Sequence, residues 1–412
     1  MKIGYLHLGP FEHGINRYGR LLAAESQQRS SLDVLEAEIV LTDNPIYNQE
    51  VLIKAAQRLS DSDLVHIQFS YFNDRLWGSG WDQLVHLRVF LNACPCPIVA
   101  TLHDVYYVPT GVKGILKYMV PQLFSAFGIK TFGSDPSPEE ASSISTLRKA
   151  VRVVKSWWIH NFGAATATLR ELTKHAHLIL VCSQEEAQRL DSHVDPKKLK
   201  IIPHFVETRS LSTTPVEARN SLNLVKKRVI TILGFIFRPK GYQLVVEALP
   251  YLPDDIQVVF AGNADADREF VDFLHKLAQE KGVDHRIRVT GYLSEIELES
   301  YLLATDLAIC AFIAFSASGS ISTWISVGCP ILAFDLPQIS EYNLIEPDAI
   351  QVFKPYTPIA LAAAIQEFLK RDRETLSIKV ARLGQKLSLP NIIDRHLTLY
   401  TSINQHSHPN PN

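Results

Sequence analysis

Two cations and two glycines lie together in residues 234–241, which read GFIFRPKG. The cations are Arg238 and Lys240, and the glycines, Gly234 and Gly241, stand at the two ends of the segment. The segment joins a strand-like run to a helical pattern, and the unpaired N–H groups of a helix start attract anions. A proline between the two cations stiffens the turn. The pattern therefore predicts a phosphate-binding turn, with Lys240 as its best single anchor.

A second anion-binding turn is predicted in residues 316–323, SASGSIST, which also join a strand-like run to a helical pattern. Small hydroxyl residues around a glycine at a helix start offer several N–H and O–H donors to a diphosphate. Capping of the helix would account for one serine but not for the whole group. The predicted donors are Ser318, Gly319, Ser320 and Thr323.

Smaller motifs follow strand-like runs in the first half of the chain. Gly14 precedes a helical pattern, where a glycine lets backbone N–H groups approach a phosphate, although an ordinary turn explains it equally well. His103 and Asp104 place an imidazole beside a carboxylate, a pair that can exchange a proton with a substrate hydroxyl. A structural hydrogen-bonding role for His103 is the alternative. Tyr106 and Tyr107 would suit stacking on a sugar, or simple packing.

Two series of short β-rich runs, separated by helical patterns, must position these turns. The alternation predicts an α/β chain with two Rossmann-like parallel sheets, whose ligands gather at the carboxyl ends of the strands. The runs are 2–8, 34–41, 64–69, 97–102, 178–182 and 200–202 in the first series, and 228–233, 257–261, 286–290, 306–311, 330–334 and 349–353 in the second.

The two series predict two domains, residues 1–210 and 221–388, joined through a polar stretch rich in Thr and Ser. Residues 389–403 have helical character and would close the fold. Residues 404–412 are expected to form a flexible tail. Residues 109–163 are longer than a strand-to-helix connection needs to be and are expected to form an extended insertion.

The bulk composition gives no reason to expect nucleic acid as a partner, because 41 Lys and Arg against 43 Asp and Glu leave a net charge of −2. The five cysteines lack the spacing of a zinc site, so no metal is expected, and a reducing cytoplasm suits them best.

We find no signal peptide and no run long enough to span a bilayer. The basic amphipathic segment from Leu147 to Trp158 is either a peripheral membrane contact or a packed helix.

Taken together, these motifs resemble the retaining GT-B glycosyltransferases of family 4, also called glycosyl transferases group 1. The resemblance spans nearly the whole chain, and the order and spacing of the motifs are more specific than any one of them. The motifs are GINRY (14–18), TLHD (101–104), IPH (202–204), GFIFRPKG (234–241), FAG (260–262), RIRVTGYL (286–293), the run 306–311, VGCP (327–330) and DLPQISE (335–341).

The resemblance implies a GT-B fold of two Rossmann-like domains facing across a cleft, a nucleotide-diphosphate sugar donor, a hydroxyl acceptor and no cofactor. Arg238 and Lys240 would neutralise the donor diphosphate, which Gly14 would approach from the other domain. Tyr292 and Leu293 would lie near the nucleotide base, and His103 near the reacting sugar and the acceptor. The acceptor would be a polysaccharide, glycolipid or small glycoside precursor.

The sequence departs from the family at a pair of glutamates with seven residues between them, whose positions are taken here by Phe315 and Thr323. The loop resembles a variant in which Ser318, Gly319 and Ser320 face the diphosphate. The departure keeps two alternatives open: a catalytically silent glycosyltransferase-like binding or scaffold protein, and a nucleotide-sugar epimerase on the same fold.

Overall fold

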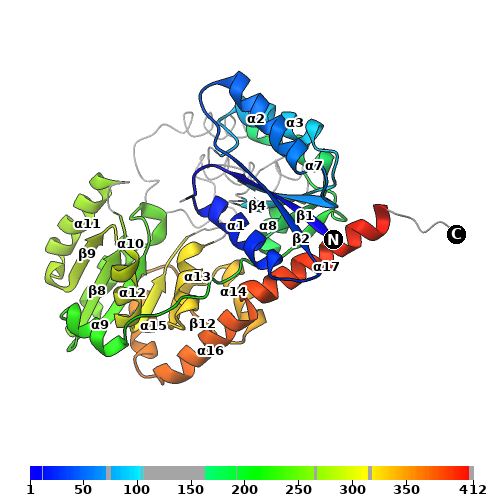
Figure 1. Ribbon diagram of the computed structural model, residues 1–412. Coiled ribbons are helices and arrows are strands. Elements are labelled where there is room, and N and C mark those ends of the chain that lie inside the picture. The colour runs from blue at the N-terminus through cyan, green and yellow to red at the C-terminus, as the bar shows by residue number, and fades with distance from the viewer. Residues whose placement is uncertain are drawn as a thin grey trace. The chain divides into compact units, whose positions relative to one another are not determined.

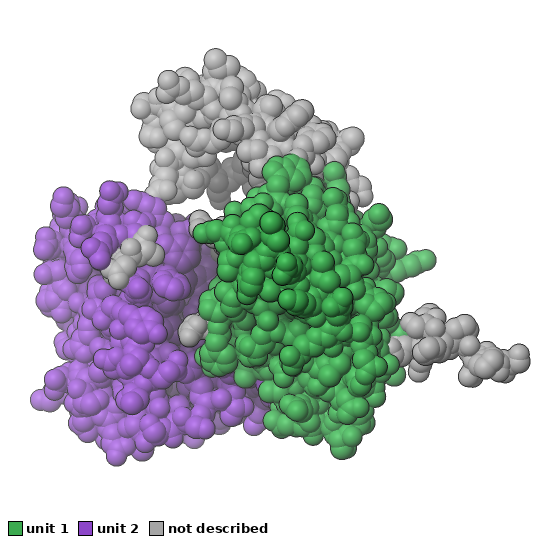
Figure 2. All heavy atoms as spheres, turned by 45° about the horizontal axis from the view of Figure 1, so that its top comes forward, with its two compact units in different colours: residues 1–202, 393–412 green, residues 203–392 purple. Residues whose placement is uncertain are grey.

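The computed structural model describes residues 1–11, 13–70, 76–103, 105, 163–191, 193–263, 267–313 and 318–407, with side chains up to residue 403. Several predicted features lie outside these residues: Asp104, Tyr106, Tyr107, Phe315, residues 109–162 of the expected insertion and the segment from Leu147 to Trp158. The chain folds into two compact units, unit 1 with residues 1–202 and 393–412 and unit 2 with residues 203–392 (Figure 2).

Unit 1 is built on a parallel sheet of six strands in the order β2-β1-β3-β4-β5-β6 (Figure 1). All residues of β3 and β4 are buried, as expected for central strands covered on both faces. The strands are β1 (Lys2–Leu8), β2 (Asp33–Ile39), β3 (Leu64–Ser70), β4 (Ile98–His103), β5 (Ala176–Val181) and β6 (Leu199–Ile201).

Side-chain caps fix the starts of several helices of unit 1. The Asn44 side chain accepts hydrogen bonds from Ile46 N and Tyr47 N, and Ser183 accepts one from Glu186 N. The described helices are α1 (Gly14–Gln27), α2 (Pro45–Arg58), α3 (Trp81–Ala93), α7 (Ala164–His175), α8 (Gln184–Arg189) and α17 (Leu389–Ser407), which begins in unit 2 and continues into unit 1.

Unit 2 repeats the plan with a second parallel sheet in the order β12-β11-β10-β7-β8-β9. The central strands β7 and β10 are neighbours, so the turns that follow them start at the same edge of the sheet. The strands are β7 (Arg228–Leu233), β8 (Ile256–Ala261), β9 (Ile287–Gly291), β10 (Leu307–Cys310), β11 (Ile331–Phe334) and β12 (Ile350–Phe353). The predicted α/β class with two Rossmann-like sheets is confirmed.

Capping boxes start two helices of unit 2, at Thr214 with Glu217 and at Ser294 with Glu297. The helices are α9 (Pro215–Ser221), α10 (Tyr242–Ala248), α11 (Arg268–Glu280), α12 (Glu295–Ala304), α13 (Gly319–Ser326), α14 (Pro337–Ile345), α15 (Pro358–Phe368) and α16 (Arg373–Lys386), with the 3-10 turns η3 (Arg238–Lys240), η4 (Leu249–Tyr251) and η5 (Asp284–Arg286).

The division into units falls earlier than the polar stretch 207–220 in which we expected it. Val206 N already donates to Leu387 O at 2.8 Å, and Thr213 N donates to the Glu299 carboxylate at 2.9 Å. These bonds tie the polar stretch to unit 2. The C-terminal helix also differs from the expectation, because α17 runs to Ser407 rather than ending at residue 403.

Candidate donor-binding site

Lys240 ends η3, and its ammonium group packs against the end of β7. Nζ donates a hydrogen bond to Leu233 O at 3.3 Å and lies 5.5 Å and 5.8 Å from the ring centroids of Phe237 and Phe312. Burial lowers its pKa from the ordinary 10.5 to about 8. Among the described residues, no carboxylate pairs with this ammonium group. The turn therefore holds a desolvated cation that an added anion would stabilise.

Glycines allow the backbone to close around Lys240. Gly234 has φ 111°, and a Cβ placed on it would lie 2.2 Å from Nζ of Lys240. Gly241 has φ 81°, and a Cβ there would lie 2.4 Å from Ala311 O. Positive φ therefore disfavours a side chain at both ends of the turn, and at Gly241 the backbone of Ala311 also leaves no room for one.

Two tyrosine hydroxyls brace the same turn. Tyr242 donates to Gly234 O at 2.8 Å, and Tyr356 donates to Ala311 O at 3.0 Å. Sequence reasoning did not identify these tyrosines as part of the site. The position of Tyr242 directly after Gly241 was an available signal, but Tyr356 lies far along the chain and carries none.

The turn after β7 also contacts the segment after β10. Ile313 N donates to Pro239 O at 3.2 Å. The turn that carries Lys240 therefore contacts the chain directly after β10.

Arg238 lies on the exposed side of the turn and is directed toward α11. Its guanidinium carbon lies 4.9 Å from the ring centroid of Phe270 and 5.8 Å from that of Phe273. These are cation–π contacts with two rings of α11. The two predicted cations thus have different surroundings.

The serine-rich segment forms the start of α13. The Ser318 hydroxyl accepts from Ile321 N at 3.3 Å and lies 3.2 Å from the Ser320 hydroxyl. A Cβ on Gly319 would meet no atom within 4 Å, so the space beside this helix start is open. The Thr323 hydroxyl instead donates back to Gly319 O at 2.9 Å. Ser318 is therefore the N-cap of α13.

Tyr292 follows β9 at the same edge of the sheet, and its side chain is 82% exposed. Leu293 instead packs partly buried against a small apolar cluster that includes Val259 and Ala304. Of the two residues predicted to lie near the base, Tyr292 is exposed to solvent and Leu293 is partly buried.

Of the predicted residues of unit 1, His103 is buried and Gly14 is exposed. His103 ends β4, is 4% exposed, and shares a hydrogen bond of 2.9 Å between its Nε2 and Gln68 Oε1. The Tyr18 ring packs edge-on against the imidazole, with centroids 5.0 Å apart. Gly14 is the first residue of α1, with no atom near its missing side chain. The turn before it is held by Asn16, whose amide donates to Leu8 O and Gly9 O.

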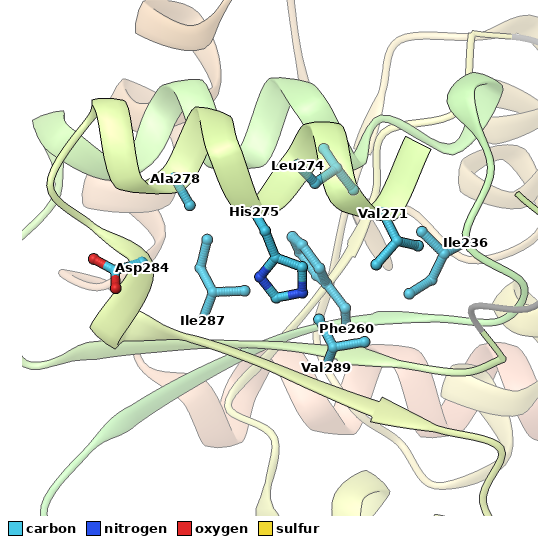
Figure 3. Close-up of a pocket in the computed structure, with 9 residues that line it drawn as sticks. All are labelled: Ile236, Phe260, Val271, Leu274, His275, Ala278, Asp284, Ile287 and Val289. Carbon is cyan, nitrogen blue, oxygen red and sulfur yellow. The ribbon is translucent and has the colours of Figure 1, made fainter. Parts of the chain in front are cut away.

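A cavity of about 10 Å³ lies under α11 but is not part of this site (Figure 3). Apolar side chains such as Ile236, Phe260 and Leu274 line it, and it has room for one water at most.

Within the described ranges, no three His, Cys, Asp or Glu side chains gather closely enough to hold a metal ion. No described helix is long and apolar enough to cross a membrane.

Comparison with known families and structures identifies the architecture. Residues 216–385 match the model of the family described as "Glycosyl transferases group 1". No curated protein matches the sequence.

The whole chain resembles several solved glycosyltransferase structures. Anabaena HepE in complex with UDP is 16% identical with a TM-score of 0.65, and the match covers 98% of this chain and 100% of that one. A glycosyltransferase from Rickettsia africae is 15% identical with a TM-score of 0.66 over 98% of both chains. Sucrose-phosphate synthase from Thermosynechococcus elongatus is 17% identical with a TM-score of 0.63 over 98% and 99% of the chains. At these identities the likeness establishes the shared GT-B fold.

Proposed function

Because residues 216–385 form a glycosyl transferases group 1 domain within a GT-B fold, we propose that this chain is a glycosyltransferase with a nucleotide-diphosphate sugar donor. The donor diphosphate binds unit 2 at the turn after β7 and at the start of α13. HepE has been solved with UDP, with UDP and glucose, and with UDP-glucose, which makes UDP-glucose the first donor to test.

The observation that carries the proposal is the environment of Lys240. Its ammonium group is desolvated enough to lower its pKa to about 8, yet it has no carboxylate partner among the described residues. A buried charge without a counterion destabilises the folded protein, so its presence favours a ligand that supplies the opposite charge. A diphosphate would do so, and the N–H groups at the start of α13 would share the second phosphate.

The proposed reaction is hexosyl transfer with retention at the anomeric carbon and without a metal. The bond between the anomeric carbon and the phosphate oxygen breaks, and its electron pair leaves with the nucleoside diphosphate. The acceptor oxygen bonds to the same face of the carbon, and its proton moves to the departing phosphate oxygen. Lys240 stabilises the charge that develops on that phosphate, and Arg238 adds long-range attraction to it.

The remaining predicted contacts belong to the same proposal. Tyr292 stacks on the nucleotide base with its exposed ring. Leu293 packs against the apolar cluster that includes Val259 and Ala304, and so holds the segment after β9 in place. Ser318, Gly319 and Ser320 contact the diphosphate. Thr323, whose hydroxyl donates to Gly319 O, is assigned to the donor as well.

Unit 1 is proposed to supply the acceptor side. His103 is assigned to the reacting sugar and the acceptor, Gly14 to the diphosphate, and Asp104, Tyr106 and Tyr107 to the acceptor. The acceptor is a hydroxyl compound such as a glycolipid or polysaccharide precursor. A peripheral membrane contact through the segment from Leu147 to Trp158 would bring a lipid-linked acceptor to the enzyme.

Turnover of the donor tests this proposal against the alternatives. Incubation with UDP-glucose, and then with GDP- and ADP-glucose, is expected to release free sugar slowly without an acceptor, and the initial product should be the α-anomer by NMR. Loss of this hydrolysis in a His103→Ala variant would support the assigned role. If no sugar nucleotide bound or turned over, the chain would instead be a silent scaffold, whereas conversion of the sugar within its nucleotide would indicate an epimerase.

A further inference from the structure

A chain of hydrogen bonds runs through the core of unit 1 from His103 to α17. His103 Nε2 lies 2.9 Å from Gln68 Oε1, and Gln68 Nε2 lies 3.3 Å from His66 Nε2. On its other side, His66 Nδ1 lies 2.7 Å from the Tyr400 hydroxyl of α17. Gln68, His66 and Tyr400 are all buried. The chain thus links a residue of the proposed site with Tyr400, more than 290 positions later in the sequence.

The orientation of the Gln68 amide, with Nε2 toward His66 and Oε1 toward His103, sets the direction of these hydrogen bonds. An amide nitrogen only donates, so Gln68 Nε2 donates to His66 Nε2, and this ring nitrogen carries no proton. Thr101, whose hydroxyl lies 2.8 Å from the same nitrogen, must donate as well. The proton of neutral His66 is therefore on Nδ1 and is donated to the Tyr400 oxygen. Burial also lowers the pKa of His66 well below its usual range, which keeps the ring neutral.

The far end of the chain is consistent with this direction. The Tyr400 hydroxyl, which accepts from His66, can donate its own proton to His396 Nδ1 at 3.3 Å. At the other end of the hydrogen-bond chain, the Gln68 amide oxygen faces His103. An amide oxygen only accepts, so His103 Nε2 is the donor and carries a proton.

We propose that Gln68 is a positioning residue for His103: anchored through His66 to Tyr400, its amide fixes the ring orientation and keeps the imidazole proton on Nε2. With the proton on Nε2, a neutral imidazole carries its lone pair on Nδ1. The inference deepens the proposed function, because the importance of this tautomer rests on His103 acting at the reacting sugar. It also means that Tyr400 of α17 must be bonded to His66 for His103 to keep this tautomer.

Selective ¹⁵N-histidine labelling of the full chain tests the proposal directly, because ring nitrogens with and without a proton have distinct shifts. His103 is assigned by comparison with a His103→Gln variant. We expect a single tautomer protonated on Nε2 in the wild type. In Gln68→Met, which keeps the size of the side chain but removes the acceptor, His103 should become a mixture of tautomers. Gln68→Glu keeps an acceptor and should restore protonation on Nε2.

Gln83→Met is the matched control. Gln83 is also buried, and its amide donates to Ser70 O at 3.2 Å, but it is not part of the chain from His103 to Tyr400. It should leave the His103 tautomer unchanged. Tyr400→Phe removes the anchor and should shift the His66 and His103 signals together. Protonation of wild-type His103 on Nδ1, or an unchanged tautomer in Gln68→Met, would overturn the proposal.

Kinetics separate this inference from the proposed function. With UDP-glucose as the probe, Gln68→Met is expected to lower kcat of hydrolysis about tenfold, with KM within about twofold of wild type. A general loss of packing would move Tm and KM as well. If UDP-glucose is not turned over at all, the proposed function fails for this donor, while the NMR result still decides the role of Gln68.

Discussion

At the scale of single residues, Lys240 shows how a binding group can act against stability. Its ammonium is held against Leu233 O and two aromatic rings, in surroundings that disfavour charge. The cost is present in the free protein and is offset when an anion binds. The same residue is therefore expected to lower stability and raise affinity.

The stability effect has a definite pH dependence. The pKa of Lys240 is about 8 in the folded chain and about 10.5 when exposed, so below pH 8 the full cost of the buried charge is present. Between about pH 8 and 10.5, Lys240 is neutral in the folded chain but still protonated in the unfolded chain. The free energy of unfolding therefore rises with pH until the cost of the buried charge is gone. Lys240→Met should therefore raise stability at pH 7 by on the order of 2 kcal/mol, and this gain should vanish near pH 10. Thermal unfolding at both pH values measures it.

The matched control is Lys276→Met, which replaces an exposed lysine on α11. It should change Tm little at either pH. A Lys240→Met variant that is less stable than wild type at pH 7 would show that the ammonium group is well accommodated without a ligand.

Donor affinity should have its own pH profile. Diphosphate binding requires charged Lys240, so the Kd for UDP-glucose should rise as pH increases through about 8, by up to tenfold per pH unit. Lys240→Met should bind weakly with no such rise. Titration calorimetry from pH 7 to 9 measures both profiles, and a flat wild-type profile would argue against contact between Lys240 and the donor.

At the scale of elements, the turn after β7 depends on the close approach of its backbone to the segment after β10. Gly241 has positive φ, and its missing side chain is the space occupied by Ala311 O. The Tyr242 and Tyr356 hydroxyls bond to carbonyls on the two sides of this contact. The position of the cation thus depends on backbone that only glycine can supply.

Replacing Gly241 by alanine should therefore do more than strain φ. We expect a loss of at least 2 kcal/mol in stability together with weaker UDP-glucose binding, because Ala311 or the turn must move. Gly282→Ala provides the control, since Gly282 also has positive φ, 69°, but has no atom near its missing side chain. It should cost about 1 kcal/mol and leave donor binding unchanged. Equal effects of the two variants on both measurements would contradict the steric account.

The sequence predicted the elements of this site better than their surroundings. The strand–turn–helix pattern and the flanking glycines of residues 234–241 are local features, so they can be recognised without a structure. That Arg238 lies over Phe270, and that Tyr356 braces Ala311, depends on pairs distant in the chain. In unit 1, the hydrogen bond between His66 and Tyr400 likewise joins residues distant in the chain.

At the scale of the whole molecule, the C-terminal helix completes the core of the first unit. The α17 residues Ile393, His396 and Tyr400 are almost completely buried, and Tyr400 bonds to β3 through His66. Sequence periodicity predicted a closing helix, but not that its buried face would belong to the N-terminal unit, because that assignment depends on tertiary contacts.

Shortening the chain tests this role of α17. A chain ending at Ile392 loses several buried side chains and should be destabilised by several kcal/mol, with rapid proteolysis of unit 1. A chain ending at Ser407 retains the helix and should unfold at the wild-type temperature. If both chains had the same Tm and protease resistance, α17 would not be part of the core.

The central claim, that unit 2 binds a nucleotide-diphosphate sugar through Lys240, is tested most directly by calorimetry with UDP-glucose at pH 7. We expect saturable binding to the wild type and to Lys276→Met with equal Kd, and binding about 10- to 100-fold weaker in Lys240→Met. Equal affinity of Lys240→Met and wild type would contradict the account.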